Sequence, residues 1–125
     1  SLPSLVKAYR IQDKARTVGF DWEEAQEVWT KVEEELQEVR QALETKDAED
    51  VEGEFGDLLF AVVNAARLYG VNPDNALERT NRKFISRFGY IESQAKAQGR
   101  DIKDLTLAEM DALWEKAKHL KHSQN

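Results

Sequence analysis

The sequence predicts an all-α protein, an antiparallel bundle of about five helices. Three observations support this class: apolar residues recur at spacings of three and four, no segment alternates as a strand would, and capping residues separate the helical segments. At 125 residues without cysteine, the chain has the size of one domain with its own core and no disulfide bonds. We expect a single domain over residues 1–120 and a frayed tail at 121–125.

The first two predicted helices precede the polar break near residue 46. Leu5 and Tyr9 recur at helical spacing in the first helix, and Gly19 ends it. Asp21 and Glu24 have the spacing of a capping box, which predicts the start of the second helix. Its predicted inward stripe covers about six turns and comprises Trp22, Ala25, Val28, Trp29, Val32, Leu36, Val39 and Leu43.

The third predicted helix extends from about Ala48 to Tyr69, with Asp47 as its N-cap. Its predicted buried stripe comprises Val51, Phe55, Leu58, Leu59, Val62, Val63 and Ala66. Gly53 and Gly56 each cost up to about 1 kcal/mol relative to alanine inside a helix, so we expect another helix or a ligand to come close there. The short link before the third helix predicts that helices two and three are antiparallel neighbours.

The last two predicted helices lie beyond residue 70. Asn72 is an N-cap candidate for the fourth helix, which we expect to extend to about Ala97. Its predicted buried face comprises Leu77, Thr80, Phe84, Ile85, Phe88 and Ile91. Thr106 and Glu109 have capping-box spacing and predict a final helix that ends near Leu120.

Two acidic pairs on the second and third helices are the main functional signal. Glu35 with Glu38, and Glu54 with Asp57, are each spaced i,i+3, so each pair shares one helix face at roughly 5–6 Å. At an effective dielectric constant of about 20, each pair repels by roughly 3 kcal/mol. Because no cysteine or nearby histidine is present, we expect all four to bind Mg²⁺, with Mn²⁺ as a substitute. Glu34 could reach the same ion.

The net charge of -6 is distributed unevenly. Residues 21–57 contain 15 acids and 3 bases, whereas the remainder contains 9 acids and 15 bases. An acidic centre flanked by bases fits a metal site with a polyanionic ligand, but ordinary solvated helices give similar counts, so charge alone leaves both interpretations open. The bases form no continuous stripe and no apolar run reaches about 18 residues, so we expect neither nucleic acid nor membrane as a partner, and a cytoplasmic location.

The order of these motifs resembles the MazG family of all-α nucleoside triphosphate pyrophosphohydrolases. Glu-x-x-Glu at 35 and 38 is followed after fifteen residues by Glu-x-x-Asp at 54 and 57, which continues into Leu-Leu-Phe. Further similar features, in the same order as in the family, are Val-Gly-Phe-Asp-Trp at 18–22, Lys31-Val32, Asn64, Arg67, Asn-x-Lys-Phe-x-x-Arg-Phe at 81–88, Trp114 and Lys118. The similarity covers nearly the whole chain and is greatest to the C-terminal half of two-domain bacterial members.

The resemblance implies Mg²⁺-dependent hydrolysis of a nucleoside triphosphate to the monophosphate and pyrophosphate, with removal of unwanted nucleotides from the pool as the role. It also implies a homodimer or a dimer of dimers. Glu35, Glu38, Glu54 and Asp57 would hold the metal, with Glu35 and Glu38 counted as catalytic together with Glu34, the candidate general base or additional ligand. The expected contacts to phosphates or nucleoside are Lys31, Asn64, Lys83, Arg87, Trp114 and Lys118.

Other interpretations of these residues stay open at this point. Trp114 follows the apolar stripe of the last helix, so it is as well explained as a core residue as by stacking on a base. Lys83 and Arg87 have the spacing of an ordinary solvated face. The alternative function is a non-catalytic acidic helical interaction or oligomerisation module, which would leave Gly53, Gly56 and the clustered acids unexplained.

Overall fold

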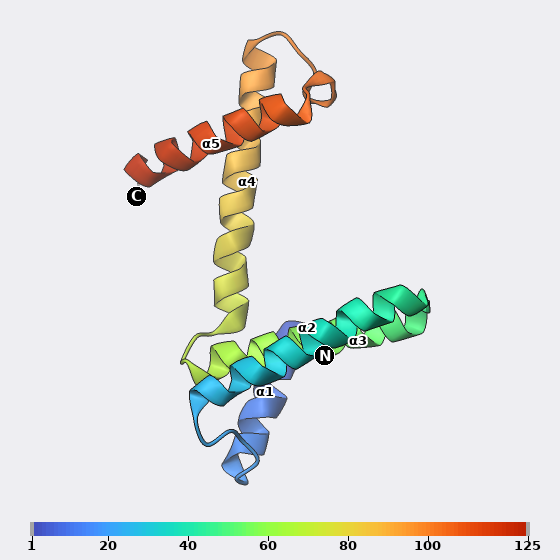
Figure 1. Ribbon diagram of the computed structural model, residues 1–125. Helices are drawn as coiled ribbons and strands as arrows, with labels where there is room; N and C mark the ends of the chain where they lie inside the picture. Colours follow the sequence, from blue (N-terminus) through green and yellow to red (C-terminus); the bar gives the residue numbers. More distant parts are fainter. Residues whose placement is uncertain (1, 125) are drawn as a thin grey trace. The chain divides into compact units, whose positions relative to one another are not determined.

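The computed structural model describes the backbone of residues 2–124 and the side chains of residues 2–120. It confirms the all-α class, because the described residues form five α-helices and no strand. The α-helices are α1 (Ser4–Thr17), α2 (Val28–Thr45), α3 (Ala48–Leu68), α4 (Pro73–Ala97) and α5 (Leu107–Gln124), and two 3-10 helices are η1 (Ala25–Glu27) and η2 (Ile102–Asp104) (Figure 1).

The chain divides into two compact units, Ser1–Ala76 and Leu77–Asn125. The single domain expected over residues 1–120 stays a prediction. Helix α5 continues through residues 121–124, where the sequence suggested a frayed tail, and Asn125 lies outside the described residues.

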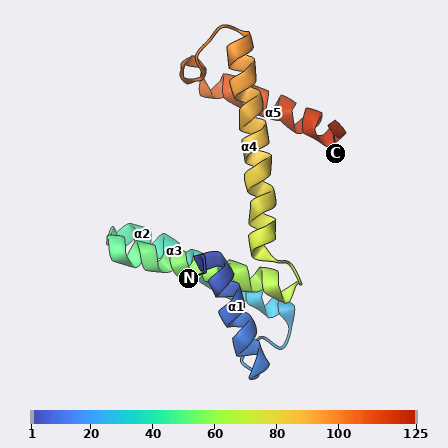
Figure 2. The same cartoon turned by 180° about the vertical axis from the view of Figure 1, so that it is seen from behind.

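In the first unit, α2 and α3 form an antiparallel hairpin, and α1 packs against α3 (Figures 1 and 2). The buried apolar side chains between these helices are small: Val28, Val39, Ala42, Ala61, Val63 and Ala65. Val28 is the largest side chain that is fully buried among the described residues. Small side chains allow two helix backbones to approach closely, but they bury little apolar area per residue.

The predicted helix ends are confirmed wherever the capping partner is local. The Asp47 side chain accepts hydrogen bonds from the backbone N–H groups of Glu49 and Asp50, at 3.0 and 3.4 Å. Asn72 accepts from the backbone N–H of Asn75 at 3.1 Å. Gly19 follows α1 with a φ of +88°, a conformation that glycine adopts without a steric penalty.

The capping box predicted at Asp21 and Glu24 is wrong. A capping box forms instead between Glu24 and Glu27 at the 3-10 turn η1, and α2 begins only at Val28. The Asp21 carboxylate is occupied elsewhere, because it accepts a hydrogen bond from the Arg67 guanidinium of α3 at 2.5 Å. A charged partner that is distant in sequence therefore displaces the local cap.

The predicted inward stripes of α2 and α3 are correct only in part. Large apolar side chains that we expected to be buried are 40–63% exposed: Trp29, Leu36, Leu43, Phe55, Leu59 and Val62. On α2 these residues recur every seven positions, in a stripe that adjoins the one with the buried Val28 and Val39. The hairpin therefore carries a second apolar face, which no other helix of the first unit covers.

The second unit consists of most of α4, together with η2 and α5. Its buried cluster comprises Ile91, Ala95, Leu105 and Leu113. The buried face predicted for α4 is wrong for Leu77, Phe84, Ile85 and Phe88, which are 37–69% exposed, whereas Ile91 is buried as expected. The cluster of this unit involves only the later turns of α4.

Residues 100–109 close the second unit. The Thr106 and Glu109 capping box predicted at the start of α5 is confirmed by reciprocal hydrogen bonds of 2.9 and 3.1 Å. Arg100 donates to both carboxylate oxygens of Glu109, at 2.5 and 3.1 Å. None of the helices in the described part of the chain has the length and apolar character that a bilayer crossing requires.

Candidate functional site

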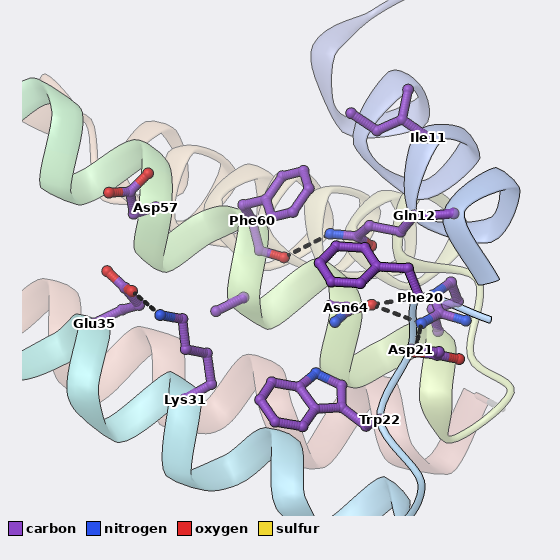
Figure 3. A pocket seen from close by; sticks show the side chains of 13 residues that line it. Ile11, Gln12, Phe20, Asp21, Trp22, Lys31, Glu35, Asp57, Phe60 and Asn64 are labelled. Carbon is purple, nitrogen blue, oxygen red and sulfur yellow. Dashed lines mark hydrogen bonds and ion pairs between the residues drawn. The ribbon is translucent and has the colours of Figure 1, made fainter. Parts of the chain in front are cut away.

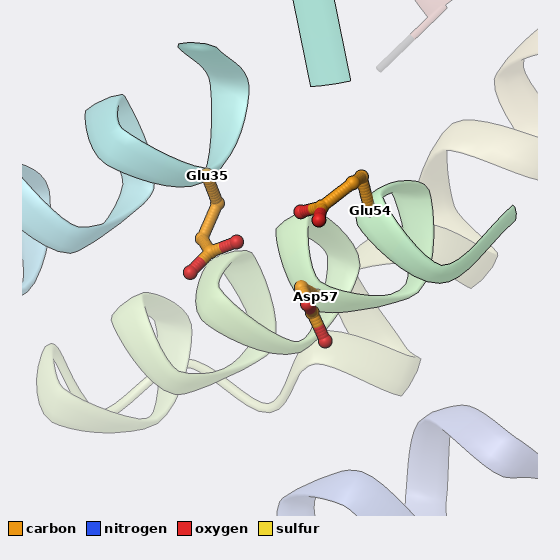
Figure 4. Close-up of side chains that lie close together, drawn as sticks. All are labelled: Glu35, Glu54 and Asp57. Atoms are coloured by element: carbon orange, nitrogen blue, oxygen red, sulfur yellow. The ribbon is translucent and has the colours of Figure 1, made fainter. Parts of the chain in front are cut away.

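Three carboxylates converge between α2 and α3 of the first unit. Glu35 of α2 and Glu54 and Asp57 of α3 each place one oxygen so that all three oxygens lie within 4.8 Å of one another (Figure 4). Glu35 is buried at 8% exposure, although glutamate is almost never fully buried without a partner. The antiparallel hairpin therefore brings three of the four predicted metal ligands to one point, and this cluster could hold a metal ion.

The electrostatics of the cluster show how crowded it is. The pKa of Glu54 is raised above its ordinary value of 4.5, first by loss of hydration and then by the negative charges of Asp57, Glu38 and Glu35. A raised carboxyl pKa means that the charged form is disfavoured. The side chains are therefore arranged so that a cation would relieve an existing repulsion.

The two other predicted acids of α2 lie at the edge of this cluster. Glu38 is exposed and does not belong to the group of three, but its charge contributes to the raised pKa of Glu54. Glu34 is exposed too, and its carboxylate lies 3.9 Å from the Lys31 ammonium. Their roles as metal ligand and general base remain predictions.

Lys31 is the cation that the chain itself supplies at the cluster. Its Nζ lies 2.9 Å from a carboxylate oxygen of Glu35, one helical turn away on α2. The hydrogen bond to Glu35 is the main reason that the pKa of Lys31 is raised above 10.5. Lys31 neutralises one of the three acids, so the cluster keeps an excess of negative charge.

The two glycines of α3 do not mark a close helix contact within the first unit. A Cβ atom placed at Gly53 or Gly56 would meet no protein atom within 4 Å, apart from the nearby backbone of its own helix. Of the two reasons that the sequence suggested, approach of another helix is therefore not seen in the described residues. Open space beside Glu54 and Asp57 leaves room for a ligand or a second chain.

A cavity of about 710 Å³ adjoins the carboxylates and lies entirely within the first unit. This volume falls within the roughly 300–1,000 Å³ that is typical of small-molecule sites. Lys31, Glu35 and Asp57 lie at one end, and Phe20 and Gln12 lie toward the other (Figure 3). The cavity therefore joins a charged end to an aromatic end, as a ligand with a phosphate group and a planar ring would require.

Asn64, which the resemblance implicates in nucleoside binding, lines this cavity. Its Oδ1 accepts hydrogen bonds from Arg67 at 3.0 and 2.9 Å, so its amide nitrogen is the group left to face a ligand. Arg67 also pairs with Asp21 and is the main reason that the pKa of Asp21 is lowered. The Arg67 side chain is 6% exposed and ties the segment before η1 to α3.

The remaining predicted contacts lie in the second unit. The Arg87 guanidinium carbon is 5.4 Å from the centroid of the Trp114 ring. The centroids of the Phe84 and Trp114 rings are 5.3 Å apart. Trp114 is half-buried against the cluster of this unit, in agreement with its interpretation as a core residue. Lys83 is exposed, and Lys118 lies 3.4 Å from Glu115. Ligand contacts by these four residues stay predictions.

Gln12 of α1 is a cavity residue that none of the sequence motifs indicates. It is 6% exposed and lines the cavity, and its Nε2 donates a hydrogen bond of 2.9 Å to the carbonyl oxygen of Phe60. The missed signal is its position three residues after Tyr9 and seven after Leu5, which places a polar side chain on the apolar face of α1.

Comparison with known proteins adds a family to this geometry. Residues 21–90 match the family described as "MazG nucleotide pyrophosphohydrolase domain", and this match includes the acidic cluster and crosses the boundary between the two units. The chain is 44% identical over 117 residues to the nucleoside triphosphate pyrophosphohydrolase/pyrophosphatase MazG of Thermotoga maritima, covering 94% of this chain and 45% of that protein.

Two other relatives support the same grouping. The chain is 41% identical over 122 residues to a nucleoside triphosphate pyrophosphohydrolase of Escherichia coli K12, covering 94% of this chain and 46% of the relative. It is 51% identical over 69 residues to the uncharacterized protein YabN of Bacillus subtilis, covering 55% of this chain and 14% of the relative. The chain thus spans about half the length of the first two relatives.

Proposed function

Because the chain belongs to the MazG nucleotide pyrophosphohydrolase domain family, we propose that it hydrolyses nucleoside triphosphates to nucleoside monophosphate and pyrophosphate. The observation that carries the proposal is the convergence of Glu35, Glu54 and Asp57 at the charged end of a cavity of about 710 Å³. The names of its relatives from Thermotoga maritima and Escherichia coli describe the same activity. Clearing unwanted nucleotides from the pool, in the cytoplasm, is the role that we propose for it.

The donor set fits Mg²⁺, with Mn²⁺ as a substitute. All three converging groups are carboxylates, and hard divalent cations prefer oxygen ligands. The raised pKa of Glu54 supports this, since a bound cation would offset the neighbouring negative charges that help to raise it. Glu35, Glu54 and Asp57 would hold the ion, and Glu38 at the edge would complete the set.

The chemistry follows from the residues around that set. Glu35, Glu54 and Asp57 would hold a divalent ion there, and that ion would offset the phosphate charge and activate water for attack. Lys31, 2.9 Å from Glu35, offers a second positive charge to the phosphates from the cavity wall. Exposed Glu34 would either take a proton from the attacking water as general base or serve as an additional metal ligand.

For the rest of the nucleotide, we propose the contacts that the resemblance to the family implies. Asn64 lines the cavity and would donate its amide N–H to the nucleoside. We propose that Lys83, Arg87 and Lys118 of the second unit contact the phosphates. Trp114, whose ring Arg87 already covers on one side, would contact the base or the sugar.

We also propose that the chain forms a homodimer, or a dimer of dimers, through the second apolar face of the hairpin. That face comprises Trp29, Leu36, Leu43, Phe55, Leu59 and Val62, each 40–63% exposed, and the Tyr69 ring adjoins it by contact with Trp29. Contiguous exposed apolar surface of this kind marks protein contacts, and two-fold association covers the same surface on both copies. Association through this face would also bury large apolar side chains, which the interior of the first unit lacks.

A homodimer would have a solution mass of twice 14.4 kDa, and a dimer of dimers would have a mass of four times 14.4 kDa. Leu59→Lys places a charge in the apolar face and should shift the protein toward monomer in sedimentation measurements. Leu107→Lys, the same change at an exposed leucine of α5, serves as the control. A monomeric wild-type protein at micromolar concentration would contradict the dimer.

The experiment that tests the activity identifies the products of the wild-type protein. Incubation of a panel of NTPs and dNTPs with Mg²⁺ should yield pyrophosphate and the monophosphate in equal amounts. Release of inorganic phosphate with a diphosphate would contradict the proposed reaction. Absence of any product over the whole panel would favour the alternative, a non-catalytic acidic helical interaction module.

A further inference from the structure

The aromatic end of the cavity contains one polar group that no contact within the first unit explains. Gln12 is 94% buried, and its Oε1 is one of two buried side-chain polar atoms without a hydrogen-bond partner among the described residues. Burying an amide oxygen without a partner is unfavourable, so such atoms usually have a partner in a ligand or ordered water. Gln12 lines the cavity, which makes a ligand in that cavity the available partner.

The orientation of the Gln12 amide is fixed by its other end. Nε2 donates to the carbonyl oxygen of Phe60 at 2.9 Å, and a carbonyl oxygen can only accept a hydrogen bond. The amide therefore cannot turn over without losing this bond, and Oε1 remains an acceptor. A ligand that pairs with Gln12 must present an N–H or O–H group.

The surroundings of Gln12 favour a flat, largely apolar ligand group. Phe20 and Trp22 line the same part of the cavity, and Phe20 is 81% exposed with an aromatic face open to a ligand (Figure 3). Asp21, between these two aromatic residues, is held to α3 by the buried Arg67. The aromatic wall is thus fixed to the helix that also carries Asp57 at the charged end.

We propose that Gln12 is a specificity-determining residue, whose Oε1 accepts a hydrogen bond from an N–H group of the substrate's nucleobase while Phe20 and Trp22 contact the ring. The proposal rests on the proposed function, because it places the nucleoside of the triphosphate in this cavity. It extends that function by naming the substrate class: nucleotides whose base carries an N–H donor on the edge that reaches α1. Bases without that donor leave Oε1 buried and unpaired.

The test measures binding of nucleoside 5′-monophosphates, which contain no bond that a pyrophosphohydrolase cleaves. In three pairs the second member lacks a base N–H donor of the first: adenosine and purine riboside, cytidine and pyrimidin-2-one riboside, and uridine and 3-methyluridine monophosphates, where a methyl group replaces the N3 hydrogen. Titration calorimetry on the wild-type protein gives a Kd for each, with ribose 5-phosphate as the base-free reference. The donor-bearing member of the most tightly bound pair should bind about 10-fold or more tightly than its partner.

Substitution then assigns that preference to Gln12. Gln12→Leu should reduce the ratio of Kd values within that pair to near 1 and leave binding of ribose 5-phosphate unchanged. Gln37→Leu, the same change at an exposed residue of α2, should keep the wild-type ratio. If Gln12→Leu binds ribose 5-phosphate differently from the wild type, the substitution has altered the fold of the variant. The ratio of Kd values measured on the wild-type protein then decides for or against the proposal by itself.

Two results would overturn the proposal: a wild-type ratio near 1 in all three pairs, or a ratio that persists in a folded Gln12→Leu protein. Failure of the proposed hydrolase activity would be seen separately. In that case a ratio of 10 or more would persist in the binding experiment while no pyrophosphate forms from any triphosphate.

Discussion

Two clusters of charged side chains, one in each unit, use glutamate in opposite ways. In the second unit, Glu109 accepts from Arg100 and from the backbone of Thr106, and these bonds lower its pKa from 4.5 to about 2. In the first unit, Glu54 lies beside Asp57 and Glu35, and its pKa is raised instead. One environment stabilises the carboxylate charge and the other opposes it.

The two clusters differ in whether the chain itself balances their charges. The Arg100–Glu109 pair is complete within the chain, because each charge has its opposite and the bonds close a loop and cap a helix. The cluster of three acids is incomplete, since Lys31 neutralises only one of them. Like charges held together by a packed hairpin indicate a site for a cation from outside the chain.

The largest expected contrast is in activity. Asp57→Asn keeps the size of the side chain but removes one charge of the proposed metal site, so we expect pyrophosphate release to fall about 100-fold or more. Glu109→Gln should leave the rate unchanged when it is assayed well below its melting temperature. Steady-state kinetics with a saturating triphosphate and Mg²⁺ measures both variants.

Glu33→Gln, at an exposed position of α2 next to the cluster, controls for the general loss of acidic charge and should behave like the wild type. Equal losses of activity in Asp57→Asn and Glu109→Gln would show that the two clusters do not differ in function. The distinction between them would then be lost.

A smaller contrast is expected in the dependence of stability on pH, measured as the melting midpoint in EDTA. Because the folded-state pKa of Glu54 lies above 4.5, its protonation stabilises the folded chain as the pH falls toward 4.5, and this contribution is lost as the pH rises. The contribution of Glu109 to stability changes with pH in the opposite direction. Its charge stabilises the fold above pH 4.5, and this contribution is lost as the pH falls from 4.5 toward about 2.

Variants separate the two contributions to the pH curve. The difference between wild type and Glu54→Gln should change with pH just above 4.5, and that between wild type and Glu109→Gln should change below 4.5. Differences that change in the same pH window and with the same sign would contradict the opposite environments of these two residues.

The sequence predicted the helices well because their ends depend on local chemistry. Asp47, Asn72 and the Thr106–Glu109 box cap the helices as expected, since each partner lies within three residues. Asp21 was assigned wrongly for the complementary reason. Its partner Arg67 is 46 residues away, and no local spacing shows such a bond.

The apolar faces and the cavity were harder to predict. Helical periodicity shows that Leu36 and Phe55 belong to apolar stripes, but not whether another helix covers those stripes. The acidic pairs were found because like charges at i,i+3 conflict with ordinary helix packing. Gln12 was missed because its one signal is a polar side chain at an apolar position of α1, and that position alone does not show that a cavity adjoins it.

We propose that Glu35, Glu54 and Asp57 form a cation site that lowers the stability of the fold when the cation is absent. The decisive measurement is the melting midpoint of the wild type and of Asp57→Asn, each in EDTA and in excess Mg²⁺. We predict that Mg²⁺ raises the wild-type midpoint, with about 2.7 kcal/mol of stabilisation at 100 times the Kd. In EDTA, Asp57→Asn should melt above the wild type and should gain less from Mg²⁺. A wild-type midpoint that Mg²⁺ does not move, together with an Asp57→Asn protein that melts below the wild type in EDTA, would contradict the claim.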